Sequence, residues 1–344
     1  MSRVPNPLNP NSKKDRIDSL AATAGDRHRS GDHAQPGGGV AVATVDDAGH
    51  VEESTGVSLL ASAWRRLRRN PVFLLGLAIT TIFVIVAIFA PWLAPHDPAK
   101  GLLITEVRQQ TNPIPAARPG FPLGADNAGR DIFSRLIVGS RQTLVVGVMA
   151  TLFGFLGGLT LGTLAGALGG WVDSLVMRIV DVMLSIPSLL LAFSIAAIAA
   201  RPSQWTVIIA IAVVQVPVFA RLLRGSMLAQ RASDHVLAAR ALGVKRSAIV
   251  FRHMLPNAMG PVIVQATLVV ATSIIDAAAL SFLGLGNPDD RQPEWGQMLG
   301  AAQRFIYDYP ALAIWPALCI IVVALGFTLM GESLREALDP KSRR

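Results

Sequence analysis

Six stretches of this chain are long and apolar enough to cross a membrane, and they constrain its fold more than any other feature. A bilayer core about 30 Å thick needs about 20 apolar residues in helical form. The runs are continuous and rich in Leu, Ala, Val, Ile and Gly, whereas barrel strands are short and alternate in polarity. The sequence therefore predicts an all-α membrane protein with a six-helix transmembrane bundle. The expected spans are 71–93, 141–168, 175–199, 205–224, 258–284 and 310–331.

Basic residues predict how the spans are oriented. Residues 64–70, WRRLRRN, place four arginines directly before the first span, and basic residues near span ends favour the cytoplasmic side. Alternation then places 225–256 and both termini in the cytoplasm, and the loops 94–140 and 285–309 outside. The net charge of +8 is interpreted as cytoplasmic loop charge, so no nucleic-acid partner is expected, whereas membrane lipid is.

The predicted domain organisation follows these spans. Residues 1–57 are rich in Gly, Ser, Asp, Arg and Pro and are expected to be a disordered cytoplasmic tail. A basic flank and the first span occupy 58–93, and an extracytoplasmic loop occupies 94–140. Five spans and a cytoplasmic elbow at 233–256 make a core domain at 141–331. A cytoplasmic tail at 332–344 ends the chain.

The sequence lacks the motifs of several chemistries. No lysine follows a glycine, so there is no Gly-Lys-Ser/Thr phosphate cradle for ATP. No histidine lies within a span, which argues against an intramembrane Ser/His protease. The single cysteine, Cys319, lies in an apolar run. We therefore expect a chain that is not an enzyme, with no catalytic residues, no metal site and no cofactor of its own.

Few polar side chains interrupt the spans. Arg178 and Asp181 are three residues apart and are expected to pair on one helix. Asp276 has no such neighbour, and a charge near a helix centre costs about 2.5–3.5 kcal/mol on insertion scales, so it is a functional candidate. The predicted substrate path is lined by Gln215, Gln265, Ser273 and Asp276.

The charged segment 234–258 predicts an elbow. Its apolar residues recur with helical spacing on both sides of Gly243, and glycine readily takes the left-handed conformation that ends a helix. Two short amphipathic helices should meet there, and Pro256 suits the first turn of the fifth span. The residues alone favour docking on a partner and lying on anionic lipid equally.

The outside segment 129–139, GRDIFSRLIVG, carries apolar residues on one helical face and predicts an interfacial helix leading into the second span. Around the start of this segment, Asp126, Arg130 and Asp131 are expected either to hold a polar turn together or to contact an extracytoplasmic partner.

Several motifs together resemble one family. Residues 237–243, LAARALG, followed by HMLPN at 253–257, resemble the EAA coupling motif of bacterial ABC importer permeases. Further blocks in family order make residues 64–344 similar to the C-type subunit of the oligopeptide, dipeptide and nickel permease family. These blocks are RRNPVFLLGLAI (68–79), PLGADNAGRDIFSRL (122–136), GGWVDSLVMRIVDVMLSIPSLLLA (169–192), LSFLGLG (280–286) and GESLREALDP (331–340).

This resemblance implies a type I ABC importer-like permease in a bacterial cytoplasmic (inner) membrane. Such a permease pairs with a homologous B-type permease and receives substrate from an extracytoplasmic substrate-binding protein. Its elbow docks on one of two ATP-binding subunits, which use ATP and Mg. Leu237 stands where the motif's glutamate is expected, so docking here must rest on apolar contact and neighbouring polar groups. The carried-over coupling residues are Leu237, Ala238, Ala239, Gly243, His253, Leu255, Pro256 and Asn257.

The predicted function is that of a permease subunit for di- or oligopeptides, which forms half of a translocation pathway and works by alternating access. Nickel or another small solute is an alternative substrate within the same family. A stand-alone channel or ion-coupled carrier, and a membrane anchor with residues 1–57 as a signalling arm, are alternatives from other classes.

Overall fold

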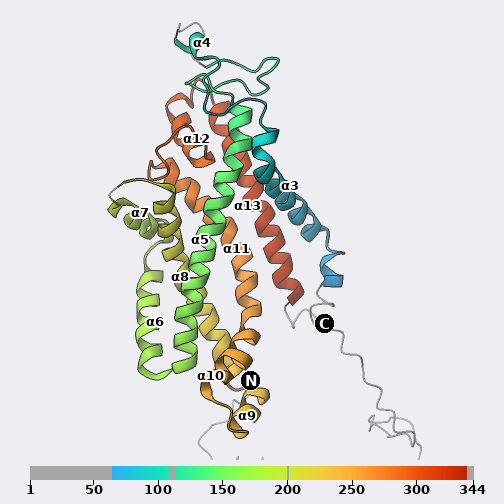
Figure 1. Cartoon of the computed structure of the whole chain (residues 1–344), viewed down its shortest axis with the longest axis vertical. Coiled ribbons are helices and arrows are strands. Elements are labelled where there is room, and N and C mark those ends of the chain that lie inside the picture. The colour runs from blue at the N-terminus through green and yellow to red at the C-terminus, as the bar shows by residue number, and fades with distance from the viewer. Residues whose placement is uncertain (1–63, 109–113, 200, 339–344) are drawn as a thin grey trace, which may run out of the picture. The chain divides into compact units, whose positions relative to one another are not determined.

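The computed structural model describes residues 64–108, 114–199 and 201–338, so the expected tail 1–57 lies outside the described residues. The regular elements that it describes are helices, which confirms the all-α prediction (Figure 1). The long helices are α3 (Pro71–Leu93), α5 (Ile132–Leu168), α8 (Gln204–Arg231), α11 (Leu255–Phe282) and α13 (Ala311–Leu338). The shorter ones are α4 (Ile104–Arg108), α6 (Gly170–Ser185), α7 (Ser188–Ile198), α9 (Asp234–Ala241), α10 (Arg246–Ala248), the π-helix η2 (Ile249–Met254), α12 (Trp295–Ala302) and the 3-10 helix η3 (Gln303–Phe305).

The third predicted span is wrong as a single helix. Its residues form α6 and α7, which meet at an angle of 97°, so the described chain has five long apolar helices, or six spans if this bent pair counts as one. Ile186, between the two helices, is extended at φ −93° and ψ 133°. Pro187 explains this, because proline disfavours helical backbone in the residue before it.

Two helices are longer than their apolar windows. α5 begins at Ile132, where Asp131 caps it by accepting hydrogen bonds from the backbone N–H groups of Phe133 and Ser134. It then runs on unbroken to Leu168, so the separate interfacial helix expected at 129–139 is the first part of this span. α13 continues to Leu338, past the predicted cytoplasmic boundary at 331.

Glycines on one face of α5 allow it to pack closely along α8. A Cβ atom at Gly158 would lie 2.3 Å from Phe219 Cβ, and one at Gly162 would lie 2.8 Å from the Ala220 carbonyl oxygen. Gly154 lies one turn before Gly158 and Gly166 one turn after Gly162, and both also pack closely against residues of α8. The small residues therefore bring the two backbones together, as expected where no hydrophobic effect drives helix association.

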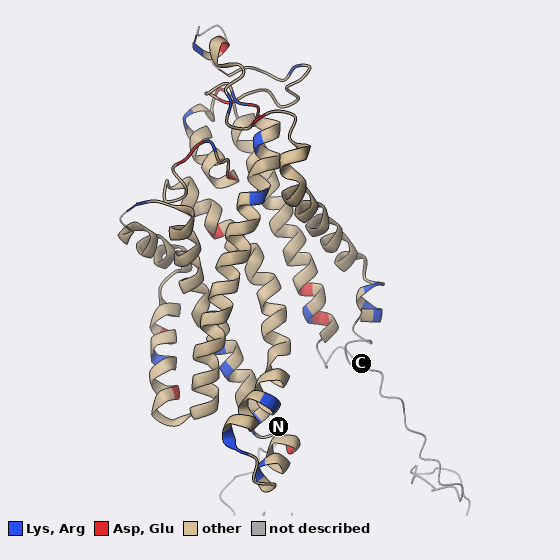
Figure 2. Ribbon diagram, in the orientation of Figure 1, with Lys and Arg blue, Asp and Glu red and all other residues tan. Residues whose placement is uncertain are grey.

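Most charged residues of the described chain lie toward the two ends of the helices (Figure 2). We call the end that carries α9 and α10 the elbow end, and the end that carries α4 and α12 the loop end (Figure 1).

Along α6 and α8, the predicted Arg178–Asp181 pair is wrong: Asp181 pairs instead with Arg221, and Asp173 pairs with Arg224 at 2.7 Å. Carboxylates of α6 thus bind arginines of the neighbouring helix.

Candidate functional site

The elbow turns at Gly243, as predicted. Its φ of +71° lies in the left-handed region. The backbone N–H of Val244 donates to the Ala239 carbonyl at 3.1 Å, and that of Gly243 donates to the Arg240 carbonyl at 3.0 Å. These two bonds make a Schellman motif, which satisfies carbonyl groups left unpaired at the end of α9. The turn is therefore held by backbone geometry that favours glycine.

The second arm of the elbow differs from the prediction. It is not a separate helix, because α10, the π-helical turn η2 and α11 form one unbroken helical path from Arg246 to Phe282. Pro256 is near the start of α11, directly after η2. Proline cannot donate a backbone hydrogen bond, and a π-helical turn is one way in which a helix accommodates such a defect.

The elbow buries one face and exposes the other. Val236, Ala239 and Met254 are packed in a cluster with Phe219 and Leu223 of α8, so the motif's Ala239 points inward. The exposed face carries Leu237 at 48%, Leu242 at 83% and Phe251 at 62% exposure. We call these three residues the elbow face. Ala238 is also exposed, whereas Leu255 and His253 are intermediate.

Polar contacts tie the elbow together and join it to α5. The Asn257 side-chain amide donates to the His253 carbonyl at 2.7 Å and lies 3.3 Å from His235 Nε2 on α9. Arg246 donates to the carbonyls of Ala167 and Leu168, at 2.7 and 2.9 Å. Sequence reasoning missed this contact, although a basic residue is a common partner for the last carbonyls of a helix.

Three of the four predicted path residues line a single cavity of about 350 Å³ between α6, α7, α8 and α11: Gln215, Gln265 and Asp276. That volume lies within the range of small-molecule sites. The fourth prediction, Ser273, is wrong, because its side chain is fully buried and its hydroxyl lies 3.2 Å from Thr151 Oγ1 of α5. Ser273 therefore serves helix packing.

Three polar side chains of this cavity have no partner among the described residues, whereas Thr272 donates its hydroxyl to the Val269 carbonyl at 3.0 Å. Within the described chain, the side chains of Asp276, Gln215 and Gln265 make no hydrogen bond or ion pair. Gln215 is only 6% exposed, and Gly154 of α5 packs against its Cβ atom. Buried polar groups usually find partners. These three side chains are therefore available to bind a molecule that enters the cavity.

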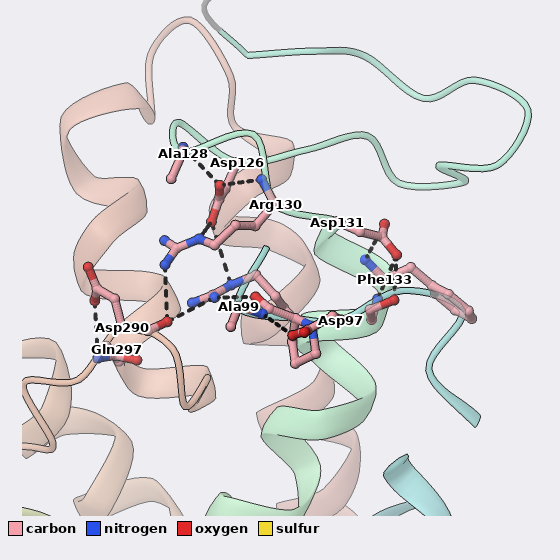
Figure 3. A network of polar contacts seen from close by, with 12 residues as sticks. Asp97, Ala99, Asp126, Ala128, Arg130, Asp131, Phe133, Asp290 and Gln297 are labelled. Carbon is pink, nitrogen blue, oxygen red and sulfur yellow. Dashed lines mark hydrogen bonds and ion pairs between the residues drawn. The ribbon is translucent and has the colours of Figure 1, made fainter. Parts of the chain in front are cut away.

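A polar network joins the segments at the loop end (Figure 3). Asp126 accepts from Arg130 Nε at 2.8 Å, and Arg130 donates to the Asp290 carbonyl at 3.0 Å. Arg135 donates to the same Asp290 carbonyl and to that of Pro98, both at 3.0 Å. Asp126 and Arg130 thus hold a polar turn together, and Arg130 also joins this turn to the loop before α12. Arg135 was missed because its carbonyl partners are distant in sequence.

Asp131 is wrong as a partner contact. It is fully buried, accepts from Ser134 Oγ at 2.6 Å and lies 3.1 Å from His96 Nδ1. The His96 ring in turn stacks on Phe121, with ring centroids 4.6 Å apart. Asp131 therefore anchors the loop before α5 and has no surface for another protein.

The loop before α12 also holds a buried carboxyl group. Glu294 is 7% exposed, and burial raises its pKa to about 7, although the nearby Ser281 hydroxyl acts in the opposite direction. The next residue, Trp295, donates from Nε1 to the Leu136 carbonyl at 2.9 Å. Glu294 thus lies in a firmly anchored part of the loop end.

Two family models match the chain. Residues 158–344 match the binding-protein-dependent transport system inner membrane component, and residues 58–116 match the N-terminal TM domain of oligopeptide transport permease C. The chain is 43% identical over 297 residues to a dipeptide transport system permease protein of Alkalihalophilus pseudofirmus, covering 85% of this chain and 93% of that protein. It is 39% identical over 278 residues to a glutathione transport system permease protein of Pectobacterium atrosepticum, covering 81% and 90%.

Among solved structures, an inward-facing conformation of the MetNI methionine ABC transporter is similar at 21% identity and a TM-score of 0.48. The match covers 60% of this chain and 96% of that one.

Proposed function

We propose, from the premise that this chain belongs to the family of binding-protein-dependent transport system inner membrane components, that it forms half of the pathway of an ATP-driven importer of di- or oligopeptides. Membership makes it a multi-pass permease subunit of an ABC importer. What we propose beyond this membership is the substrate, the partners and the orientation of the chain in the membrane.

The observation that carries the proposal is the connection between the elbow face and the cavity. Phe251 of the elbow face and Asp276 of the cavity belong to the same helical path, Arg246–Phe282. A protein that binds the elbow face therefore acts directly on a helix that lines the cavity. This arrangement suits coupling by movement, with ATP and Mg used by two partner ATP-binding subunits.

Docking on an ATP-binding subunit would be mainly apolar here. Leu237, at the position of the family's glutamate, is half exposed, and Leu242 and Phe251 of the elbow are exposed as well. Aromatic and aliphatic side chains that become buried at an interface often dominate its binding energy. Arg240, Lys245 and Arg252 are also exposed on the elbow and favour a partner cleft with an acidic rim.

A second permease of the B type would complete the pathway. Leu175, Ile179 and Val182 of α6 are exposed at 50–56%, on a helix that contributes to one wall of the cavity. Such a surface is suited to lipid or to another helix. We assign part of it to the partner permease, and the loop end to the substrate-binding protein. Both termini are then cytoplasmic, as the basic residues predict.

The choice of peptides rests on the relatives and on the cavity. The similar proteins carry the names of dipeptide and glutathione permeases. The free side-chain amides of Gln215 and Gln265 each offer both donors and an acceptor, as peptide groups do. An amide-lined path suits peptides of varied sequence, since it contacts the backbone that they share.

Reconstitution in liposomes tests the proposal. The chain together with its partner permease, ATP-binding subunits and binding protein should accumulate a labelled dipeptide only when ATP is present. The chain alone should transport nothing. Uptake by the isolated chain would support a stand-alone carrier instead, and normal uptake by the full complex after the elbow face is changed to three serines would exclude coupling through that face.

A further inference from the structure

Among the residues that the structure describes, Asp276 is the only ionisable one that lines the 350 Å³ cavity. The rest of the lining is apolar or neutral and polar, including Gln215, Gln265 and Thr272. A carboxylate that is partly removed from water and unpaired is unfavourable on its own, and a cation that reaches it relieves this cost. The cavity therefore favours positively charged groups over negatively charged ones.

The two arginines of α8 that pair with carboxylates of α6 do not neutralise Asp276. On α8, Arg221 pairs with Asp181 and Arg224 pairs with Asp173, both toward α6. The Asp276 carboxylate has no ion pair or hydrogen bond among the residues that the structure describes. Its counter-charge must therefore come from elsewhere, and the cavity is the route by which a small molecule reaches it.

The polar residues of α11 in the cavity form a single line. Gln265, Thr272 and Asp276 are separated by seven and four residues, which places them on one face of the helix. The eleven residues from Gln265 to Asp276 correspond to about 16 Å along the axis. An extended peptide advances about 3.5 Å per residue, so this line accommodates a chain of up to about four residues.

We propose that Asp276 binds the amino-terminal ammonium group of a peptide in transit, while the amides of Gln215 and Gln265 bind its peptide groups. This inference rests on the proposed function and makes it more specific. Asp276 lies toward the loop end of α11, six residues before its last residue, Phe282. The peptide is then held with its amino end toward the loop end and its remaining residues toward Gln265. A charge-assisted hydrogen bond to a carboxylate is stronger than a neutral one, which favours a free amino terminus.

Binding to the purified complex of both permeases and the ATP-binding subunits tests this assignment. The binding protein is left out, so that its own selectivity does not contribute. Dissociation constants are measured for a dipeptide with a free amino group and for its N-acetylated form. In the wild type, the free dipeptide should bind at least tenfold more tightly. Asp276→Asn should remove this preference, whereas Asp276→Glu should retain it.

Asp181→Asn is the matched control, since Asp181 is an exposed carboxylate outside the cavity. It should leave the preference unchanged, and the melting temperature of each variant shows that it is folded. A wild type without the preference, or an Asp276→Asn complex that keeps it, overturns the inference. Peptide uptake by the complete wild-type transporter is measured separately. Its absence would overturn the proposed function, whereas uptake without the preference at Asp276 would overturn only this inference.

Discussion

A substitution at Gly243 tests the elbow turn directly, because its free-energy cost comes from backbone conformation alone. A Cβ atom added there meets nothing within 4 Å, so Gly243→Ala introduces no clash. The residue nevertheless holds a φ of +71°, which costs other residues roughly 1–2 kcal/mol. Any effect of the substitution therefore reports the left-handed turn itself.

That cost should appear in ATPase binding. If docking requires the turn as observed, 1–2 kcal/mol weakens the affinity for the ATP-binding subunits about 5- to 30-fold. The dissociation constant of the permease pair for these subunits and the rate of ATP-driven uptake measure the effect. Gly243→Asn should retain more binding than Gly243→Ala, since asparagine tolerates this conformation better.

Gly260→Ala is the matched control. Gly260 also has open space around it, but it lies in α11 without a positive φ, so alanine should be tolerated. Full binding and uptake by Gly243→Ala, with the variant shown to be inserted and folded, would refute the role of the turn. Equal losses in the Gly243 and Gly260 variants would show that the effect is not specific to the turn.

Three further predictions concern packing, protonation and docking. Gly158→Ala should lower the melting temperature in detergent through an overpacking cost of about 1–3 kcal/mol against Phe219, while Gly225→Ala, which meets nothing within 4 Å, should not. Because the folded pKa of Glu294 is raised from 4.5 to about 7, the folded state retains a proton that the unfolded state has lost, so the free energy of unfolding should fall as pH rises through this window. Glu294→Gln should flatten that dependence in a thermal melt, and an unchanged profile would assign it to another group. Leu237→Ala should weaken ATPase binding by about 1–2 kcal/mol in a direct binding measurement, and unchanged affinity would show that Leu237 stays exposed in the complex.

The helices were predictable where a physical constraint acts along the chain. Long apolar runs located the five long helices of the described chain, because crossing a membrane demands about 20 such residues. The turn at Gly243 could also be predicted from neighbouring residues, since a second helical pattern follows this glycine. The bend at Pro187 was also visible in the sequence, but the apolar window that spans it concealed the break.

The candidate sites could be predicted from the sequence only in part. Helical spacing separates Ser273 from the line through Gln265, Thr272 and Asp276, because Ser273 lies about 100° around the helix from Thr272. The direction that this line faces is set by the packing of α11 on α8, which no local pattern reveals. Arg135 was missed for the same reason, since its carbonyl partners are distant in sequence.

The helical path from Arg246 to Phe282 has 37 residues, or about 55 Å at 1.5 Å per residue. A helix resists compression along its axis, so a push on the elbow along that axis moves Asp276 by a similar distance. Sideways displacement is different, because the π-helical turn Ile249–Met254 and Pro261 are places where a helix bends readily. The direction of a force applied to the elbow therefore decides how far Asp276 moves.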